Sequence, residues 1–134
     1  MTVLPGGCLC GDVRYLVHGD PFNATVCHCT DCRRAAGSPM VAWFTVRPDA
    51  FEFTAGEPRR FDSSPGAERS FCPRCGTPLT FRHTDLDEVD VTTCSLDDPG
   101  AVPPADHTRF ARHVGWAVPG DTLPRYPGKR PAPG

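Results

Sequence analysis

Eight cysteines are the residues of this 134-residue chain best suited to chemistry, and they are grouped. They form a C-x-C pair, a C-x-C-x-x-C triad, a C-x-x-C pair and one isolated residue: Cys8 and Cys10; Cys27, Cys29 and Cys32; Cys72 and Cys75; and Cys94. In a reducing compartment, thiolates that lie close together are ligands that zinc prefers. The spacing therefore predicts that seven of the eight cysteines bind zinc, with two ions per chain.

The two pairs predict a structural zinc site. A closed set of four ligands results when the C-x-C pair meets the C-x-x-C pair: Cys8, Cys10, Cys72 and Cys75. Alternate side chains of an extended segment share a face, so both thiols of the C-x-C pair point the same way. Gly11 and Gly76 each follow a second cysteine and can adopt the positive φ of a tight turn. Four protein ligands are typical of structural zinc, and this site would tie together distant parts of the chain.

The triad predicts a different kind of site because it supplies three ligands. Cys27 and Cys29 share one face of an extended segment, and His28 turns away from them. Cys32 can turn back toward them from a short helix. Three protein ligands leave a fourth position on zinc for water or substrate, which is the arrangement of catalytic zinc. We therefore expect a catalytic zinc at this triad.

Three other interpretations of the cysteines remain open. A disulfide framework would also use eight cysteines, but it needs an oxidising compartment. Redox chemistry at the C-x-x-C pair needs a βαβ context, which the sequence does not indicate. The second site would be purely structural if Cys94 or a histidine supplied a fourth ligand. We expect instead that Cys94 is a free, small buried residue. We also expect His83, His107 and His113 to lie at the surface or form hydrogen bonds.

Short strands must position these cysteines, since 13 glycines and 16 prolines favour many turns. Val13, Tyr15 and Val17 alternate with other residues at the period of a strand. A helix is expected over residues 31–36, with Thr30 as its N-cap and Gly37 closing it. Further strands are expected over residues 25–29, 40–46, 51–54, 79–82 and 89–93, loops over 57–66 and 97–108, and packing on the sheet over 110–118. The sequence thus predicts a mainly β chain that forms a single domain over residues 1–134.

The distribution of charge argues against nucleic acid as a partner. The formal net charge is −2, and the basic residues are scattered arginines with a single lysine, Lys129. No apolar run approaches the roughly 20 residues that span a bilayer, so no membrane partner is expected. The first seven residues lack the basic and apolar regions of a signal peptide. We expect a cytoplasmic location, where thiols stay reduced.

Three motifs around the cysteines match the pattern of a known family. They are Gly7-Cys8-Leu9-Cys10-Gly11, Cys27-His28-Cys29-Thr30-Asp31-Cys32-Arg33 and Phe71-Cys72-Pro73-Arg74-Cys75-Gly76. With them the chain resembles the glutathione-dependent formaldehyde-activating enzyme family, which includes the domain of centromere protein V. The resemblance covers about residues 5–127 and leaves 128–134 as a tail expected to fray. It implies a β-tent-type fold of small antiparallel sheets, with a structural zinc at the two pairs and a catalytic zinc at the triad.

The resemblance also implies a reaction. The activity that names the family adds glutathione to formaldehyde and gives S-(hydroxymethyl)glutathione, a carbon–sulfur lyase-class reaction. The partners would be a small thiol such as glutathione and a small aldehyde, with thiol sulfur or aldehyde oxygen at the open position of the catalytic zinc. Arg33 and Arg34 follow the triad and could hold a substrate carboxylate through bidentate contacts. The alternative is a zinc-stabilised binding module of the same family without this activity, and the oligomeric state is left open.

Overall fold

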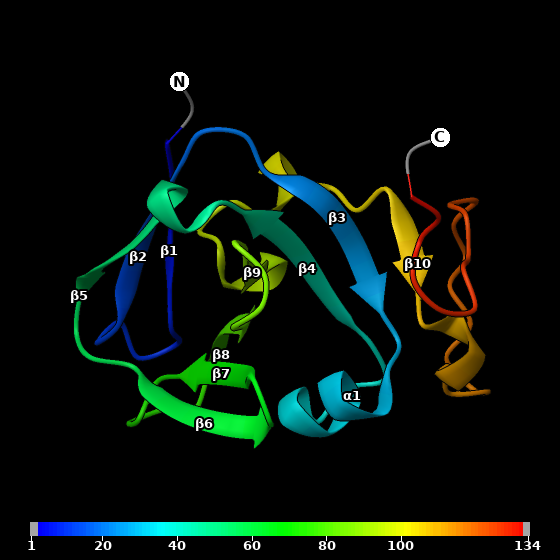
Figure 1. The fold of residues 1–134 in the computed structure, drawn as a ribbon, viewed down its shortest axis with the longest axis horizontal. Coiled ribbons are helices and arrows are strands. Elements are labelled where there is room, and N and C mark those ends of the chain that lie inside the picture. Colours follow the sequence, from blue (N-terminus) through cyan, green and yellow to red (C-terminus); the bar gives the residue numbers. More distant parts are fainter. Residues whose placement is uncertain (1–2, 133–134) are drawn as a thin grey trace.

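Residues 3–132 form two β-sheets and one short α-helix (Figure 1). The computed structural model describes residues 3–132. In chain order the elements are β1 (Val3–Gly7), β2 (Arg14–His18), β3 (Phe22–Cys27), α1 (Thr30–Ala36), β4 (Val41–Val46), β5 (Phe51–Ala55), β6 (Arg59–Ser64), β7 (Ala67–Phe71), β8 (Pro78–His83), β9 (Val89–Thr92) and β10 (Asp106–Thr108). The small sheet has the order β1-β2-β5, and the large sheet has the order β10-β3-β4-β9-β8-β7-β6. The prediction of a mainly β chain with one short helix is confirmed.

The small sheet is organised around β2. Tyr15 and Val17 of β2 are buried, whereas their neighbours in the strand are partly exposed, so the predicted alternation is correct. β1 pairs with β2 in antiparallel fashion along its whole length. The sequence did not predict this strand because Pro5 and two following glycines are disfavoured in strands. The proline is tolerated because β1 lies at the edge of its sheet.

The large sheet has β4 near its centre and two edges that the sequence did not reveal. β4 pairs antiparallel with β3 and β9, and its residues 43–46 are all buried. The expected loop at 57–66 instead contains edge strand β6, whose largely exposed residues carry no apolar alternation. The expected loop at 97–108 contains β10, which pairs in parallel with β3. Both loop predictions are therefore wrong at these strands, and the large sheet is mixed instead of purely antiparallel.

The hydrophobic core joins the small sheet to the large one. It contains buried residues of both sheets, of the turn before β2 and of the loops that follow β9: Val13, Tyr15, Val17, Phe44, Val46, Leu79, Val89, Val91, Leu96 and Val102. Gly6 lies against the ring of Tyr15, and a Cβ at this position would come within 2.4 Å of that ring. Cys8 and Cys72 also belong to this core. The segments that carry the two cysteine pairs are therefore fixed by the main packing of the molecule.

Helix α1 lies at the end of β3 and beside β4 (Figure 1). Its N-cap is Cys29, not Thr30, because the Cys29 thiol accepts a hydrogen bond from the backbone N–H of Cys32. A sulfur here takes the role that a serine or threonine oxygen usually has. Gly37 closes the helix in the left-handed conformation with φ of 62°, as predicted. The helix cap and the triad are thus made by the same residues.

The C-terminal segment lies beside β10, next to β3 (Figure 1). Backbone hydrogen bonds join this segment to β10 and to the turn that follows it. The last of these bonds along the segment is at Gly128, whose carbonyl accepts a hydrogen bond from the N–H of Arg109. Arg130 forms a bidentate ion pair with the buried Asp106, at 2.7 and 2.8 Å. Bonding therefore extends into the segment where fraying was expected. Trp116 is 81% exposed, so the expected packing of residues 110–118 on the sheet is wrong at this side chain. None of the helices in residues 3–132 is long and apolar enough to cross a membrane.

Candidate metal centres and the adjoining pocket

The two cysteine pairs meet in a four-sulfur cluster. The Sγ atoms of Cys8, Cys10, Cys72 and Cys75 all lie within 4.8 Å of one another. Two similar turns bring them together. The N–H of Gly11 bonds to the carbonyl of the first cysteine of its pair, and that of Gly76 does the same in the other pair, both with positive φ. The structure therefore brings together the four residues that the spacing grouped.

Hydrogen-bond donors surround the sulfurs of this cluster. The backbone N–H of Val13 donates to Cys8 Sγ at 3.2 Å, and two backbone N–H groups of the second turn donate to Cys72 Sγ at 3.4 Å. The Thr77 hydroxyl lies 3.2 Å from Cys75 Sγ, and this contact is the main cause that lowers the pKa of Cys75 to about 5. Donors aimed at sulfur favour the thiolate form. Four converging sulfurs with such support fit the ligand set of a structural zinc site.

The triad forms a second, three-sulfur cluster at the junction of β3 and α1. The Sγ atoms of Cys27, Cys29 and Cys32 lie within 4.8 Å of one another. Contacts with its two neighbours in the cluster lower the pKa of Cys29 to about 2, and the positive charge of Arg69 acts in the same direction. The pKa of Cys27 is raised, chiefly by Cys29. Crowded thiols thus favour one thiolate, and a divalent cation would let all three ionise. This donor set fits zinc.

Neither Cys94 nor a histidine completes the triad among the described residues. The side chain of His28 is fully buried, and its Nε2 lies 2.9 Å from Nδ1 of His107. Cys94 is exposed, so the expectation that it is buried is wrong. The reason is that β9 ends at Thr92 and a 3-10 turn then carries Cys94 outward. None of the eight cysteines forms a disulfide. The geometry therefore supports a four-donor and a three-donor cluster.

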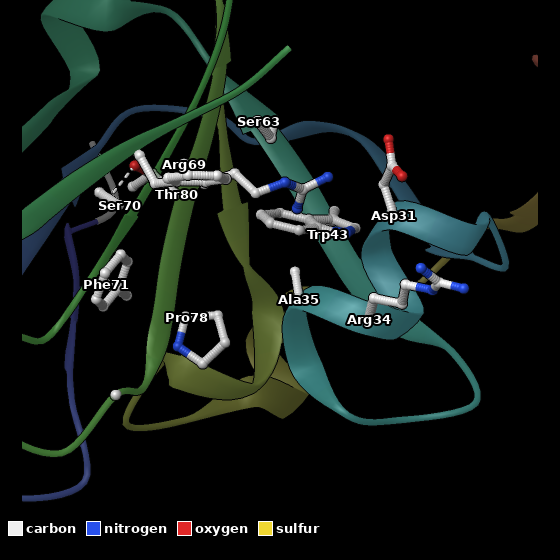
Figure 2. A pocket seen from close by; sticks show the side chains of 12 residues that line it. Asp31, Arg34, Ala35, Trp43, Ser63, Arg69, Ser70, Phe71, Pro78 and Thr80 are labelled. Carbon is white, nitrogen blue, oxygen red and sulfur yellow. Dashed lines mark hydrogen bonds between the residues drawn. The ribbon is translucent and has the colours of Figure 1, made fainter.

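A pocket of about 560 Å³ lies beside α1, the helix that carries Cys32, and none of the three triad cysteines is among the residues that line it (Figure 2). Asp31, Arg34 and Ala35 of the helix line it, together with Trp43 of β4 and residues of β6, β7 and β8. Figure 2 shows the side chain of Arg69 of β7 extending in the direction of α1, and Trp43 lines the same pocket. The guanidinium of Arg69 stacks on the ring of Phe81 at 4.9 Å. The pocket therefore combines aromatic walls with two arginines.

Two features of this pocket could not be found from the sequence. Arg69 comes from a strand that is far from the triad in the chain, and only the pairing of β4, β9, β8 and β7 brings it to the pocket beside α1. The indole Nε1 of Trp43 is buried and has no hydrogen-bond partner in the described structure. Of the two arginines suggested by their position after the triad, Arg34 lines the pocket and Arg33 does not. Arg33 has a buried Nε without a recorded partner instead.

Comparisons with known proteins give the family of the chain and a structure with a similar fold. Residues 3–112 match the model of a family described as glutathione-dependent formaldehyde-activating enzyme. A protein of Schizosaccharomyces pombe named an uncharacterized lyase is 35% identical over 86 residues, which are 63% of this chain and 61% of that protein. The chain thus spans less than two thirds of this relative. A crystal structure of a Rhodobacter sphaeroides protein has a TM-score of 0.57 and 24% identity, and it covers 69% of this chain and 87% of that one. This last likeness concerns the fold.

Proposed function

The chain belongs to the glutathione-dependent formaldehyde-activating enzyme family, and from this premise we propose that it is a zinc-dependent enzyme of the carbon–sulfur lyase class. Its substrates would be a small thiol and a small aldehyde, with glutathione and formaldehyde as the first pair to test. The observation that carries the proposal is the three-sulfur cluster at the start of α1, a helix whose residues also line a pocket with two arginines. A closed four-sulfur cluster elsewhere in the same chain leaves the triad free for a role other than holding the fold.

The proposal assigns a different role to each cluster. Cys8, Cys10, Cys72 and Cys75 would hold a structural zinc, and the triad would hold a catalytic one. Zinc bound by three thiolates supplies an electrophilic centre that favours soft sulfur and lowers the pKa of a thiol. The thiols need a reducing environment, which is why we also propose a cytoplasmic location.

The residues of the pocket would bind and orient the thiol substrate. Arg34 and Arg69 offer guanidinium groups, which bind carboxylates in a bidentate manner. Trp43 adds an aromatic wall, and its buried indole N–H has no partner within residues 3–132. Apolar side chains from α1, β6 and β8 line part of the pocket and would limit the access of water there: Ala35, Phe61 and Pro78.

The reaction needs no further reactant. The sulfur–carbon bond forms as the carbonyl π bond of the aldehyde opens, and the proton lost by the thiol ends on the new hydroxyl oxygen. Arg69 raises the local positive potential, since its charge already favours the thiolate at Cys29. The same charge would favour an ionised substrate thiol in the pocket. The main contribution of the chain would thus be to orient two small molecules and stabilise negative charge.

Exchange NMR on the zinc-loaded protein tests this proposal. The enzyme should speed the exchange between the signals of free glutathione and those of its formaldehyde adduct, compared with the same mixture without protein. Cys29→Ser should abolish the acceleration, whereas Cys94→Ser, at an exposed cysteine outside both clusters, should keep it. If wild type binds glutathione without changing the exchange rate, the alternative of a zinc-stabilised binding module replaces the enzyme. Acceleration by Cys29→Ser equal to that of wild type would also refute the proposal.

A further inference from the structure

A chain of three side chains reaches from the surface to the centre of the C-x-C motif of the triad. Nε2 of His107 lies 3.0 Å from both carboxylate oxygens of Asp121, and its Nδ1 lies 2.9 Å from Nε2 of His28. His28 and His107 are 0% and 1% exposed. Two buried imidazoles in direct contact are not needed by the proposed reaction. They require a reason of their own.

The hydrogen-bond chemistry of this chain gives it a direction. A carboxylate only accepts, so the Nε2–H of His107 donates to Asp121. The Nδ1 of a neutral His107 is then an acceptor, and it receives the Nε2–H of His28. The Nδ1 of His28 keeps a lone pair, which agrees with its being buried without a partner. Asp121 therefore selects the tautomer of His107, and through it the orientation of the His28 ring.

The backbone around His28 is tied to the same C-terminal segment. Its N–H bonds to the carbonyl of Thr108 at 3.1 Å, and β10 pairs with β3 so that Thr108 lies opposite Cys27. The ring of Phe110 packs edge-on against His28 at 4.9 Å between centroids. The side of β3 away from the triad sulfurs is thus held by residues that come at least 79 positions later.

We propose that His107 and Asp121 are positioning residues, which act through His28 to hold Cys27 and Cys29 in their metal-binding arrangement. The proposal rests on the triad being a metal site. A metal site with three protein ligands depends more on the position of each ligand than a site with four, because no fourth protein ligand can hold the metal when one of the three is displaced. A ring fixed on one face of the C-x-C segment limits the rotation that would separate the two thiols on the other face. Asp121 lies outside the segment 3–112 that matches the family, whereas His28 and His107 lie within it.

The test compares Asp121→Ala with Asp121→Asn. The Asp121 side chain is 42% exposed, so its removal should leave the fold intact, and near-UV circular dichroism would check this. Cobalt(II) serves as the probe, because cobalt–thiolate absorption reports each cluster, and chelator competition gives the two affinities. We expect Asp121→Ala to weaken cobalt binding by the triad about tenfold and to leave the four-cysteine cluster unchanged. Asp121→Asn should restore binding, since its amide oxygen accepts the same hydrogen bond.

A second readout and a matched control complete the experiment. Long-range ¹H–¹⁵N spectra of the imidazoles should show His107 protonated at Nε2 in wild type and Asp121→Asn, and altered in Asp121→Ala. Asp85→Ala removes another carboxylate beside a histidine, His83, and should change neither affinity. Wild-type triad affinity in Asp121→Ala, equal weakening of both clusters, or no recovery in Asp121→Asn would overturn the positioning role.

The outcomes separate this inference from the proposed function. If the wild-type triad binds metal, Asp121→Ala weakens that binding, and the protein shows no turnover, the proposed enzymatic function is refuted and the positioning role is supported. Full turnover with unchanged affinity in Asp121→Ala would do the opposite. A wild-type triad that binds no cobalt would overturn both.

Discussion

Loss of a ligand from the four-cysteine cluster should destabilise the protein more than loss of a ligand from the triad. The comparison uses Cys72→Ser and Cys29→Ser. Cys72 is fully buried in the main core, whereas Cys29 caps a seven-residue helix and is half-buried. The first cluster joins segments that are far apart in the chain, and the second joins residues that are close neighbours. A cross-link constrains the unfolded chain more when it closes a longer loop.

The size of the difference follows from the two loops. If a metal cluster restricts the unfolded chain as a disulfide does, a loop of roughly 65 residues contributes about 4 kcal/mol and one of about six residues contributes about 2 kcal/mol. The gap of about 2 kcal/mol corresponds to a difference in Tm of roughly 5–10 °C in a chain of this size. Cys72→Ser loses in addition the sulfur that accepts two backbone N–H groups, so this gap is a lower bound.

Urea unfolding with zinc in excess, followed by far-UV circular dichroism, measures this difference. Cys94→Ser is the matched control, since it removes an exposed thiol outside both clusters and should leave the midpoint unchanged. Equal losses of stability in Cys72→Ser and Cys29→Ser would refute the division into a structural and a catalytic site. A larger loss in Cys29→Ser would reverse it.

Three further results are expected. Burial raises the pKa of Asp90 from 3.8 to about 6. Ionisation of Asp90 therefore lowers the stability of the fold, by an amount that is absent below about pH 4, grows as the pH rises, and is complete above about pH 6. Asp90→Asn keeps the acceptor for Thr45, and it should raise the unfolding free energy by about 2 kcal/mol at pH 8, with the gain over wild type disappearing as the pH falls to 4; a gain independent of pH would contradict this. Arg69→Met should raise the KM for a carboxylate-bearing thiol roughly tenfold and change little for a neutral thiol, whereas Arg59→Met on the exposed edge strand should affect neither; an equal rise for both thiols would exclude carboxylate binding by Arg69. Iodoacetamide should modify Cys94 alone in the zinc-loaded protein, as read by mass spectrometry, and modification of a triad cysteine under these conditions would contradict metal binding there.

The parts of the structure that depend on local spacing could be predicted from the sequence. The two cysteine clusters follow from C-x-C and C-x-x-C geometry, and the end of α1 follows from Gly37. Strand β1 was missed because Pro5 argues against a strand unless its edge position is known. Strand β6 was missed because an exposed edge strand owes its conformation to pairing with its neighbour, not to an apolar pattern. Cys94 was expected to be buried because residues 91–95 have the pattern of a continuous strand, whereas β9 ends at Thr92.

The pocket and the histidine chain could not be predicted, since both depend on sheet order. Arg69 meets α1 only because β7 lies three strands from β4 in the large sheet. His107 meets His28 only because β10 pairs in parallel with β3, in a segment that the sequence marked as a loop. Long-range pairing of this kind leaves no mark within a local window of residues. The histidines were rightly expected to form hydrogen bonds, but their partners could not be named.

The two clusters differ in what holds them, and this difference bears on how metal binding at the triad is controlled. The four-cysteine cluster contributes two residues to the main core and receives backbone donors from its own turns, so its geometry is fixed by folding itself. The triad sits where β3 passes into α1, and one side of that junction faces a pocket. Its other side is held by β10 and by the residues that follow β10 in the chain. A substitution near the C-terminus, far from every cysteine in sequence, can therefore change the metal affinity of the triad while the structural cluster keeps its own.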